Sequence, residues 1–267
     1  MKASRLVSPF VVAVLVAIGC GGGKPQEVSA TSNEQGSGTV QLAQAPAEAQ
    51  PSGPTGSASI HGTVRFEGTA PSSEKIKMDA DPVCQQQHAT SVSSEAVVVN
   101  SNGTLQHVFV YVKEGAKGPF PPATQPVVLD QSGCWYRPHV FGIQVNQPLE
   151  IVNSDATLHN INAKPTVNQP FSIAQPVKGM KSKKAFAKPE VMVKFKCNVH
   201  PWMNTYAGVL DHPFFSVSGA DGSFAITGLP AGAYVLEAWH ETYGAQMQHV
   251  TVGDGESKSV AFTFKGK

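Results

Sequence analysis

The feature that most constrains the fold is an alternation of apolar and polar residues with a period of two, from about Ser59 to the C-terminus. Successive side chains of a β-strand point to opposite faces, so this period predicts strands with one buried face. The segments with this pattern are 60–66, 143–151, 191–197, 224–226, 234–238, 250–252 and 260–264, while 107–112 is a continuous apolar run of the kind expected for a central strand. Turn signals such as Asp221-Gly222 separate them, and no window keeps a helical period of 3.6. The sequence therefore predicts an all-β fold of sandwich type.

The composition agrees with this fold and excludes several functional classes. Charged residues make up 15% of the chain, against about 25% in an average soluble protein, while Gly (25) and Pro (20) are abundant. A formal net charge of +1 gives no electrostatic basis for binding nucleic acid. No apolar run reaches the roughly 18 residues that a membrane-spanning helix needs.

The N-terminus has the pattern of an export signal. Lys2 and Arg5 precede a short apolar stretch at 6–18, and small residues then lead to Cys20. This pattern resembles the signal of bacterial lipoproteins. The resemblance implies removal of 1–19, a lipid on Cys20 and anchoring to the cell envelope, facing the periplasm or the cell surface. An ordinary secretory signal is the alternative, and it also exports the protein. Residues 20–57 lack large apolar groups, so we expect a disordered tether.

The strongest chemical signal is a short loop of metal-binding residues at the end of a predicted strand. Cys197, His200 and Met203 have the spacing Cys-x-x-His-x-x-Met, which can return three donors to one point. His159 follows another strand end, at 153–155. Two imidazoles, one thiolate and a distant thioether make a blue-copper electron-transfer site, because this donor set suits both Cu(I) and Cu(II). The alternatives are a zinc site, which favours more cysteines and no methionine, and a buried structural thiol beside ordinary histidines.

These residues resemble the cupredoxin family, with a ligand loop like those of amicyanin and plastocyanin. Segments 136–140 and 145–149 also resemble the opening strands of a cupredoxin. The resemblance implies one type 1 copper ion, with equatorial ligands His159, Cys197 and His200 and the axial ligand Met203. It also implies that Asn160 helps to fix the ligand loop by hydrogen bonding, and that His200 lies at an exposed edge as the electron port. Asn198 departs from the Ser or Thr that the family often has there, which should retune the site without abolishing it.

Two further cysteines, Cys84 and Cys134, form an even pair once Cys20 is assigned to lipid and Cys197 to metal. In an oxidising compartment we expect a disulfide between them. The alternative is a second metal site that uses Cys84 with His88, or Cys134 with His139. The sequence has no Cys-x-x-Cys-His motif for covalent haem and no His-x-His motif of the kind found in multicopper oxidases. We therefore expect a protein that is not an enzyme.

The C-terminal part resembles a different module. Segments 221–224 and 228–239 resemble the second half of carboxypeptidase-regulatory-like, transthyretin-type β-sandwiches, whose opening strands resemble 60–64 and 108–112. Because those strands precede the copper motif, we predict one sandwich made from 58–125 and 212–267, with a cupredoxin domain, 126–211, inserted into it. The alternative is a longer cupredoxin domain, 58–211, followed by a small appended domain.

These patterns together predict a lipid-anchored blue-copper protein that carries single electrons between envelope partners, such as a cytochrome or an oxidoreductase. Seven lysines lie between Lys178 and Lys196 against one acid, Glu190, and form either a docking patch for an acidic partner or a solvated hairpin. Two other functions stay open. One is copper storage or delivery, and the other is a structural or carbohydrate-binding β-sandwich lipoprotein with a vestigial site.

Overall fold

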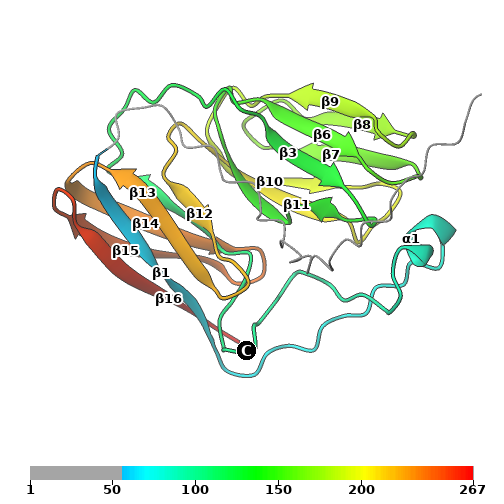
Figure 1. Ribbon diagram of the computed structural model, residues 1–267, viewed down its shortest axis with the longest axis horizontal. Coiled ribbons are helices and arrows are strands. Elements are labelled where there is room, and N and C mark those ends of the chain that lie inside the picture. Colours follow the sequence, from blue (N-terminus) through cyan, green and yellow to red (C-terminus); the bar gives the residue numbers. More distant parts are fainter. Residues whose placement is uncertain (1–55, 267) are drawn as a thin grey trace, which may run out of the picture. The chain divides into compact units, whose positions relative to one another are not determined.

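The computed structural model describes residues 56–266, which consist mainly of β-strands (Figure 1). The prediction of an all-β fold is confirmed. The predicted leader at 1–19, Cys20 and the tether up to residue 55 lie outside the described residues. Within the described range, α1 (Pro82–Gln86) has five residues, and no helix there is long and apolar enough to cross a membrane.

One sandwich is built from strands at both ends of the described chain, and we call it the flanking sandwich. Its strands are β1 (Ala58–Glu67), β2 (Phe109–Glu114), β12 (Phe215–Val217), β13 (Ser223–Leu229), β14 (Gly232–His240), β15 (Gly244–Val252) and β16 (Ser257–Lys265). Its two sheets have the strand orders β13-β1-β16 and β12-β2-β14-β15. Apolar side chains of both sheets, such as Ile60, Phe262 and Leu236, share one core. Strands that are far apart in the sequence thus pack around a single hydrophobic core.

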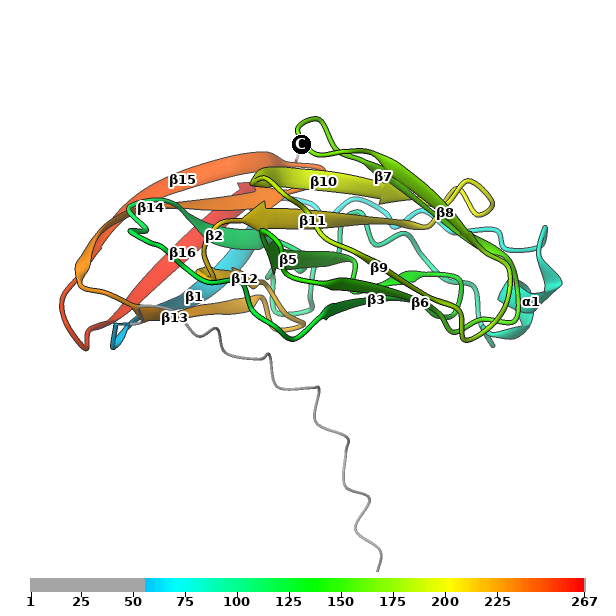
Figure 2. The ribbon, with the colours of Figure 1, turned by 90° about the horizontal axis from the view of Figure 1, so that it is seen from above.

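The other sandwich contains the strands that flank the predicted metal ligands, and we call it the central sandwich (Figure 2). Its strands are β3 (Val127–Gln131), β4 (Tyr136–Arg137), β5 (Val140–Gln144), β6 (Leu149–Asn153), β7 (His159–Lys164), β8 (Phe171–Gln175), β9 (Lys181–Lys184), β10 (Glu190–Lys196) and β11 (Asn204–Leu210). Its sheets have the orders β5-β11-β10-β7-β8 and β4-β3-β6-β9. The exact domain boundaries given above, and the likeness of the flanking sandwich to regulatory-like modules, stay predictions.

Strand β10 shows how the alternation in the sequence becomes a core. Val193, Phe195 and Cys197 are buried, whereas Lys194 and Lys196 between them are exposed. The buried side chains pack between the two sheets against residues such as Leu129 of β3. This packing fixes β10, and with it the position of Cys197 directly after its end.

Two glycines of the central sandwich allow aromatic rings of the flanking sandwich to approach its backbone. A Cβ atom on Gly208 of β11 would lie 2.3 Å from the ring of Phe109. A Cβ atom on Gly142 of β5 would lie 2.2 Å from the ring of Phe215. These rings belong to an apolar cluster in which Phe109 and Tyr111 pack with residues of β5 and β11. Glycine is therefore required at both positions by close packing.

Candidate metal centre

Strands β7 and β10 bring His159 and Cys197 to the same end of one sheet. The two strands are antiparallel, with Phe195 opposite Ala163 and Lys196 opposite Asn162. His159 is the first residue of β7, and Cys197 follows the last residue of β10. Since the start of one strand lies beside the end of the other, the two side chains meet in the core. His159 and Cys197 are 0% and 2% exposed.

The loop at 197–203 is closed by its own backbone. The Cys197 amide donates to the Met203 carbonyl over 3.1 Å, and the Met203 amide donates to the His200 carbonyl over 2.9 Å. The His200 amide also points at the Cys197 sulfur, 3.4 Å away. These contacts fold the loop back on itself, so that the three predicted donors of the loop are buried together.

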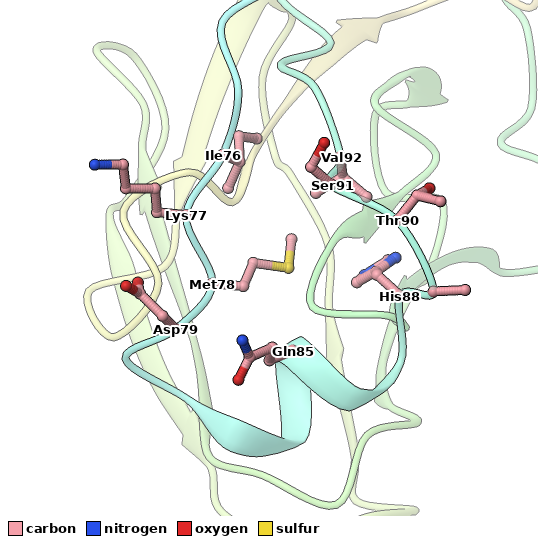
Figure 3. A pocket seen from close by; sticks show the side chains of 10 residues that line it. Ile76, Lys77, Met78, Asp79, Gln85, His88, Thr90, Ser91 and Val92 are labelled. Carbon is pink, nitrogen blue, oxygen red and sulfur yellow. The ribbon is translucent and has the colours of Figure 1, made fainter.

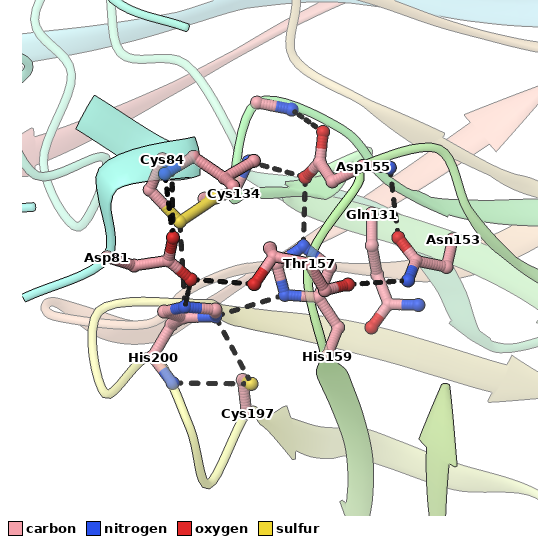
Figure 4. Close-up of polar contacts among 12 residues, drawn as sticks. Asp81, Cys84, Gln131, Cys134, Asn153, Asp155, Thr157, His159, Cys197 and His200 are labelled. Atoms are coloured by element: carbon pink, nitrogen blue, oxygen red, sulfur yellow. Dashed lines mark hydrogen bonds and ion pairs between the residues drawn. A yellow bond between two sulfur atoms is a disulfide. The ribbon is translucent and has the colours of Figure 1, made fainter. Parts of the chain in front are cut away.

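The two predicted histidine ligands face each other through the same ring atom (Figure 4). His159 Nδ1 lies 3.0 Å from His200 Nδ1. The Cys197 sulfur lies 3.9 Å from His200 Nδ1. Donor atoms of all three residues lie within 4.8 Å of one another. The structure therefore brings together the two imidazoles and the thiol that the sequence predicts as equatorial ligands.

The far nitrogen of each imidazole is held by a carboxylate. His159 Nε2 lies 2.9 Å from Asp155 Oδ2, and His200 Nε2 lies 3.0 Å from Asp81 Oδ2. Burial opposes ionisation of both acids, but their hydrogen bonds outweigh it and lower the pKa of each. An ionised carboxylate only accepts hydrogen bonds, so each imidazole carries a proton on Nε2 and turns its Nδ1 atom toward the other imidazole. Metal-binding histidines commonly have this arrangement.

The charge state of Cys197 also suits metal binding. Burial disfavours the thiolate, but hydrogen bonds from His159 and His200 outweigh burial and lower the pKa of Cys197 to about 5. Burial likewise opposes a charge on His159, while its bonds to Asp155 and Cys197 prevail and raise the pKa of His159 to about 8. A thiolate is therefore present at neutral pH, and the thiolate is the form that binds metals.

Asn160 and Asn198 lie beside the predicted donors. The Asn160 side-chain amide donates to Ser172 Oγ over 3.1 Å and to the Ile173 carbonyl over 3.2 Å, so it holds β8 and not the ligand loop. The backbone of Asn160 does reach the ligands, because its amide donates to the Cys197 sulfur. Asn198 is exposed, and its side-chain oxygen accepts from Asn162 over 3.0 Å. Neither amide side chain touches a donor atom.

The Cys84 and Cys134 side chains form a disulfide that lies against the candidate site. The Cys84 sulfur is 3.5 Å from His200 Nε2, and the Cys134 amide donates to Asp155 over 2.8 Å. His200 is only 2% exposed, because Asp81 and Cys84 cover its outer edge. The expectation that His200 lies at an exposed edge is therefore wrong. The residues that cover it come from a segment far from the ligand motif in the sequence.

The two alternative metal sites, Cys84 with His88 and Cys134 with His139, do not have the geometry of a metal site. His88 Nε2 bonds to the Gly133 carbonyl over 2.8 Å, and His139 Nε2 pairs with Glu241 over 2.5 Å. Within residues 56–266, neither histidine belongs to a group of three metal-binding side chains.

An open cavity of about 490 Å³ lies between the segments 76–79 and 88–92, where Met78 points inward (Figure 3). None of the four predicted ligands lines it.

Part of the chain is similar in structure to solved copper proteins. A copper-containing nitrite reductase from Thermus scotoductus matches at 26% identity with a TM-score of 0.28, over 37% of this chain and 25% of the reductase. This chain thus spans a quarter of the reductase's length. An amicyanin mutant with Cu(I) matches at 19% identity with a TM-score of 0.28, over 32% of this chain and 81% of amicyanin. A purple cupredoxin from Nitrosopumilus maritimus matches at 19% identity with a TM-score of 0.27, over 32% of this chain and 97% of the purple cupredoxin. No protein-family model matches the sequence, and neither does any curated protein.

Proposed function

We propose that the protein binds one type 1 copper ion through His159, Cys197, His200 and Met203 and carries single electrons. One observation supports this most strongly. With both Nε2 atoms held by carboxylates, the two Nδ1 atoms face each other at 3.0 Å beside the Cys197 sulfur. Two ring nitrogens at this distance repel unless a proton or a metal cation lies between them, and a bound metal ion would take the place of that proton. The donor set is the one that suits copper in both oxidation states.

Copper bound at this site supplies a one-electron Cu(II)/Cu(I) couple. The protein's own contribution is to keep the donors in place while the charge changes. His159 is fixed by Asp155, His200 by Asp81, and the ligand loop by its internal backbone bonds. Met203 is 0% exposed and packs in the core of the central sandwich. A dry, rigid donor set of this kind lowers the reorganisation that accompanies electron transfer.

The proposal includes a place in the cell and a class of partner. Lys2, Arg5, the apolar stretch at 6–18 and Cys20 support lipid anchoring at the envelope. The lysines of 178–196 are all exposed, and Lys164 of β7 lies opposite Lys194 of β10. The basic face that Lys164, Lys194 and Lys196 form on β7 and β10 supports an acidic redox partner, such as a cytochrome or an oxidoreductase. Under this proposal the protein is an electron carrier and not an enzyme.

Voltammetry of the copper-loaded protein separates an electron carrier from a copper-storage or delivery protein. A carrier gives a rapid, reversible one-electron wave, because the ligand geometry hardly changes between the two oxidation states. A slow, irreversible wave with loss of copper on reduction would support storage or delivery and overturn the proposal. Failure of the protein to bind copper at all would favour a structural β-sandwich with a vestigial site.

A further inference from the structure

Residues 75–93 form a loop whose two ends are joined, and we call it the cap loop. Lys75 and Ser93 form an isolated β-bridge, and the Lys75 ammonium group donates to Ser93 Oγ over 3.1 Å. Next to them, the Ile76 amide donates to the Val92 carbonyl over 3.0 Å. The chain therefore leaves the sandwich, makes an excursion and returns to the same point.

The middle of the cap loop reaches the candidate metal centre through Asp81. One carboxylate oxygen of Asp81 accepts from the amides of Val83 and Cys84, over 2.8 and 3.4 Å, and so caps the start of α1. The other oxygen pairs with His200 Nε2 at 3.0 Å and accepts from Thr157 Oγ1 over 2.7 Å. A single side chain thus ties the loop's only turn of helix to a metal ligand (Figure 4).

The cap loop is anchored on both sides of Asp81. Met78, which precedes it, is 6% exposed and packs into the core of the central sandwich. Cys84, which follows it, is bonded to Cys134, and both residues are 0% exposed. Because neither sulfur is accessible to solvent, an external thiol cannot reach this disulfide in the folded protein. The anchoring is therefore permanent and not a redox switch.

From these contacts we infer that the cap loop closes the metal centre against small anions and chelators, with Asp81 as the positioning residue that holds His200. This inference rests on the proposed copper function and deepens it. The His200 edge is the side from which an exogenous ligand would approach, and Asp81, Cys84 and Thr157 occupy it. Without the carboxylate, the imidazole loses the bond that fixes its ring, and an opening appears next to it.

The test compares the copper-loaded full chain with three variants. Asp81→Ala removes both the helix cap and the bond to His200. Asp81→Asn keeps the cap through its one oxygen but turns an amide group toward His200. Asp79→Asn is the matched control at an exposed acid of the same loop. Azide is titrated while the visible and EPR spectra are recorded, and a strong chelator is used to time the loss of copper. Wild type and Asp79→Asn should not bind azide, whereas Asp81→Asn should bind it. Asp81→Ala should bind it and release copper about 10- to 100-fold faster.

A second readout is independent of the spectra of copper. In the Cu(I) form, the His200 Nε2 proton should give a slowly exchanging NMR signal in wild type and in Asp79→Asn, and this signal should be lost in Asp81→Asn and Asp81→Ala. If Asp81→Ala does not fold, Thr157→Val loosens Asp81 without touching the helix cap and should shift both readouts in the same direction. If wild type binds azide as tightly as the Asp81 variants do, the inference that the cap loop excludes small anions is wrong, while the proposed copper function still stands. Absence of copper binding by wild type would overturn both.

Discussion

At the scale of single residues, Asp155 joins three parts of the metal centre through one carboxylate. One of its oxygens accepts from the Gly133 amide over 2.9 Å, and the other accepts from the Cys134 amide and holds His159. Asp155→Asn replaces an acceptor with an amide that faces donors, so His159 loses its orientation. We expect copper affinity to fall about 10- to 100-fold. Competition with a chelator of known affinity measures this, and Asp79→Asn serves as the control. Equal affinity in wild type and Asp155→Asn would contradict the role given to this carboxylate.

The grouping of His159, Cys197 and His200 could be predicted from the sequence, because two of them share one short loop and the third begins a strand. Asp155 lies four residues before His159, so a carboxylate partner for that imidazole could also have been recognised. The role of Asp81 could not be recognised from the sequence, because Asp81 is separated from His200 by 119 residues and contacts it only in the folded protein. For the same reason the buried edge of His200 had no signal in the sequence.

At the scale of elements, Glu190 at the start of β10 fixes the loop after β7. Its carboxylate accepts from Thr166 Oγ1 over 3.0 Å, from the Asn168 amide over 2.9 Å and from the Thr166 amide. Burial opposes ionisation of Glu190, but these bonds outweigh it and lower its pKa from 4.5 to about 2. A lowered pKa of an acid stabilises the folded state above the unfolded pKa, and this stabilisation is lost as the pH falls from about 4.5 to about 2.

The variant Glu190→Gln should therefore be less stable than wild type by about 1–2 kcal/mol at pH 7, because bonds to a charged group are lost at a partly exposed site. The difference should shrink as the pH falls toward 2. Urea unfolding of both proteins across this range checks the prediction. A difference that does not change with pH would show that the charge of Glu190 is not the cause.

The basic face of β10 gives a prediction about electron-transfer rates. Lys194→Glu with Lys196→Glu should slow oxidation by the anion ferricyanide about 3- to 10-fold at low salt, because the local positive potential is reversed. The effect should fade as salt screens the charges. Lys258→Glu with Lys265→Glu on β16 changes the net charge equally and is the matched control. Stopped-flow rates that drop equally in both double variants would contradict a patch near the metal centre.

The long alternating strands could be predicted from the sequence, whereas the short polar elements could not. β1 and β16 keep the period of two, and their large apolar side chains are buried. β10 keeps it only from Val193 onward, because its register with β11 shifts before that residue and leaves the predicted core position Val191 exposed. β9 has the sequence Lys-Ser-Lys-Lys and no apolar face, so it is defined only by its pairing with β6. α1 is too short to show a helical period, and it begins where Asp81 caps it and Pro82 follows.

At the scale of the whole molecule, Gly208 allows the two sandwiches to share a core. An added methyl group would overlap the ring of Phe109, which is 0% exposed and has no room to move. Gly208→Ala should therefore lower the free energy of unfolding by about 1–3 kcal/mol. Gly219→Ala is the control, because its nearest atom would lie 3.5 Å away, and it should change stability by no more than about 0.5 kcal/mol. Equal stability of the two variants in urea would show that the contact does not contribute.

The most direct test of the central claim is the visible and EPR spectrum of the full chain titrated with Cu(II), beside the Cys197→Ser variant. A thiolate bonded to copper in a trigonal site gives an intense blue charge-transfer band and a narrow copper hyperfine splitting, complete at one equivalent. We predict both features for wild type and neither for Cys197→Ser. A colourless complex in wild type, or a blue band that persists without the Cys197 thiolate, would contradict the proposed copper centre.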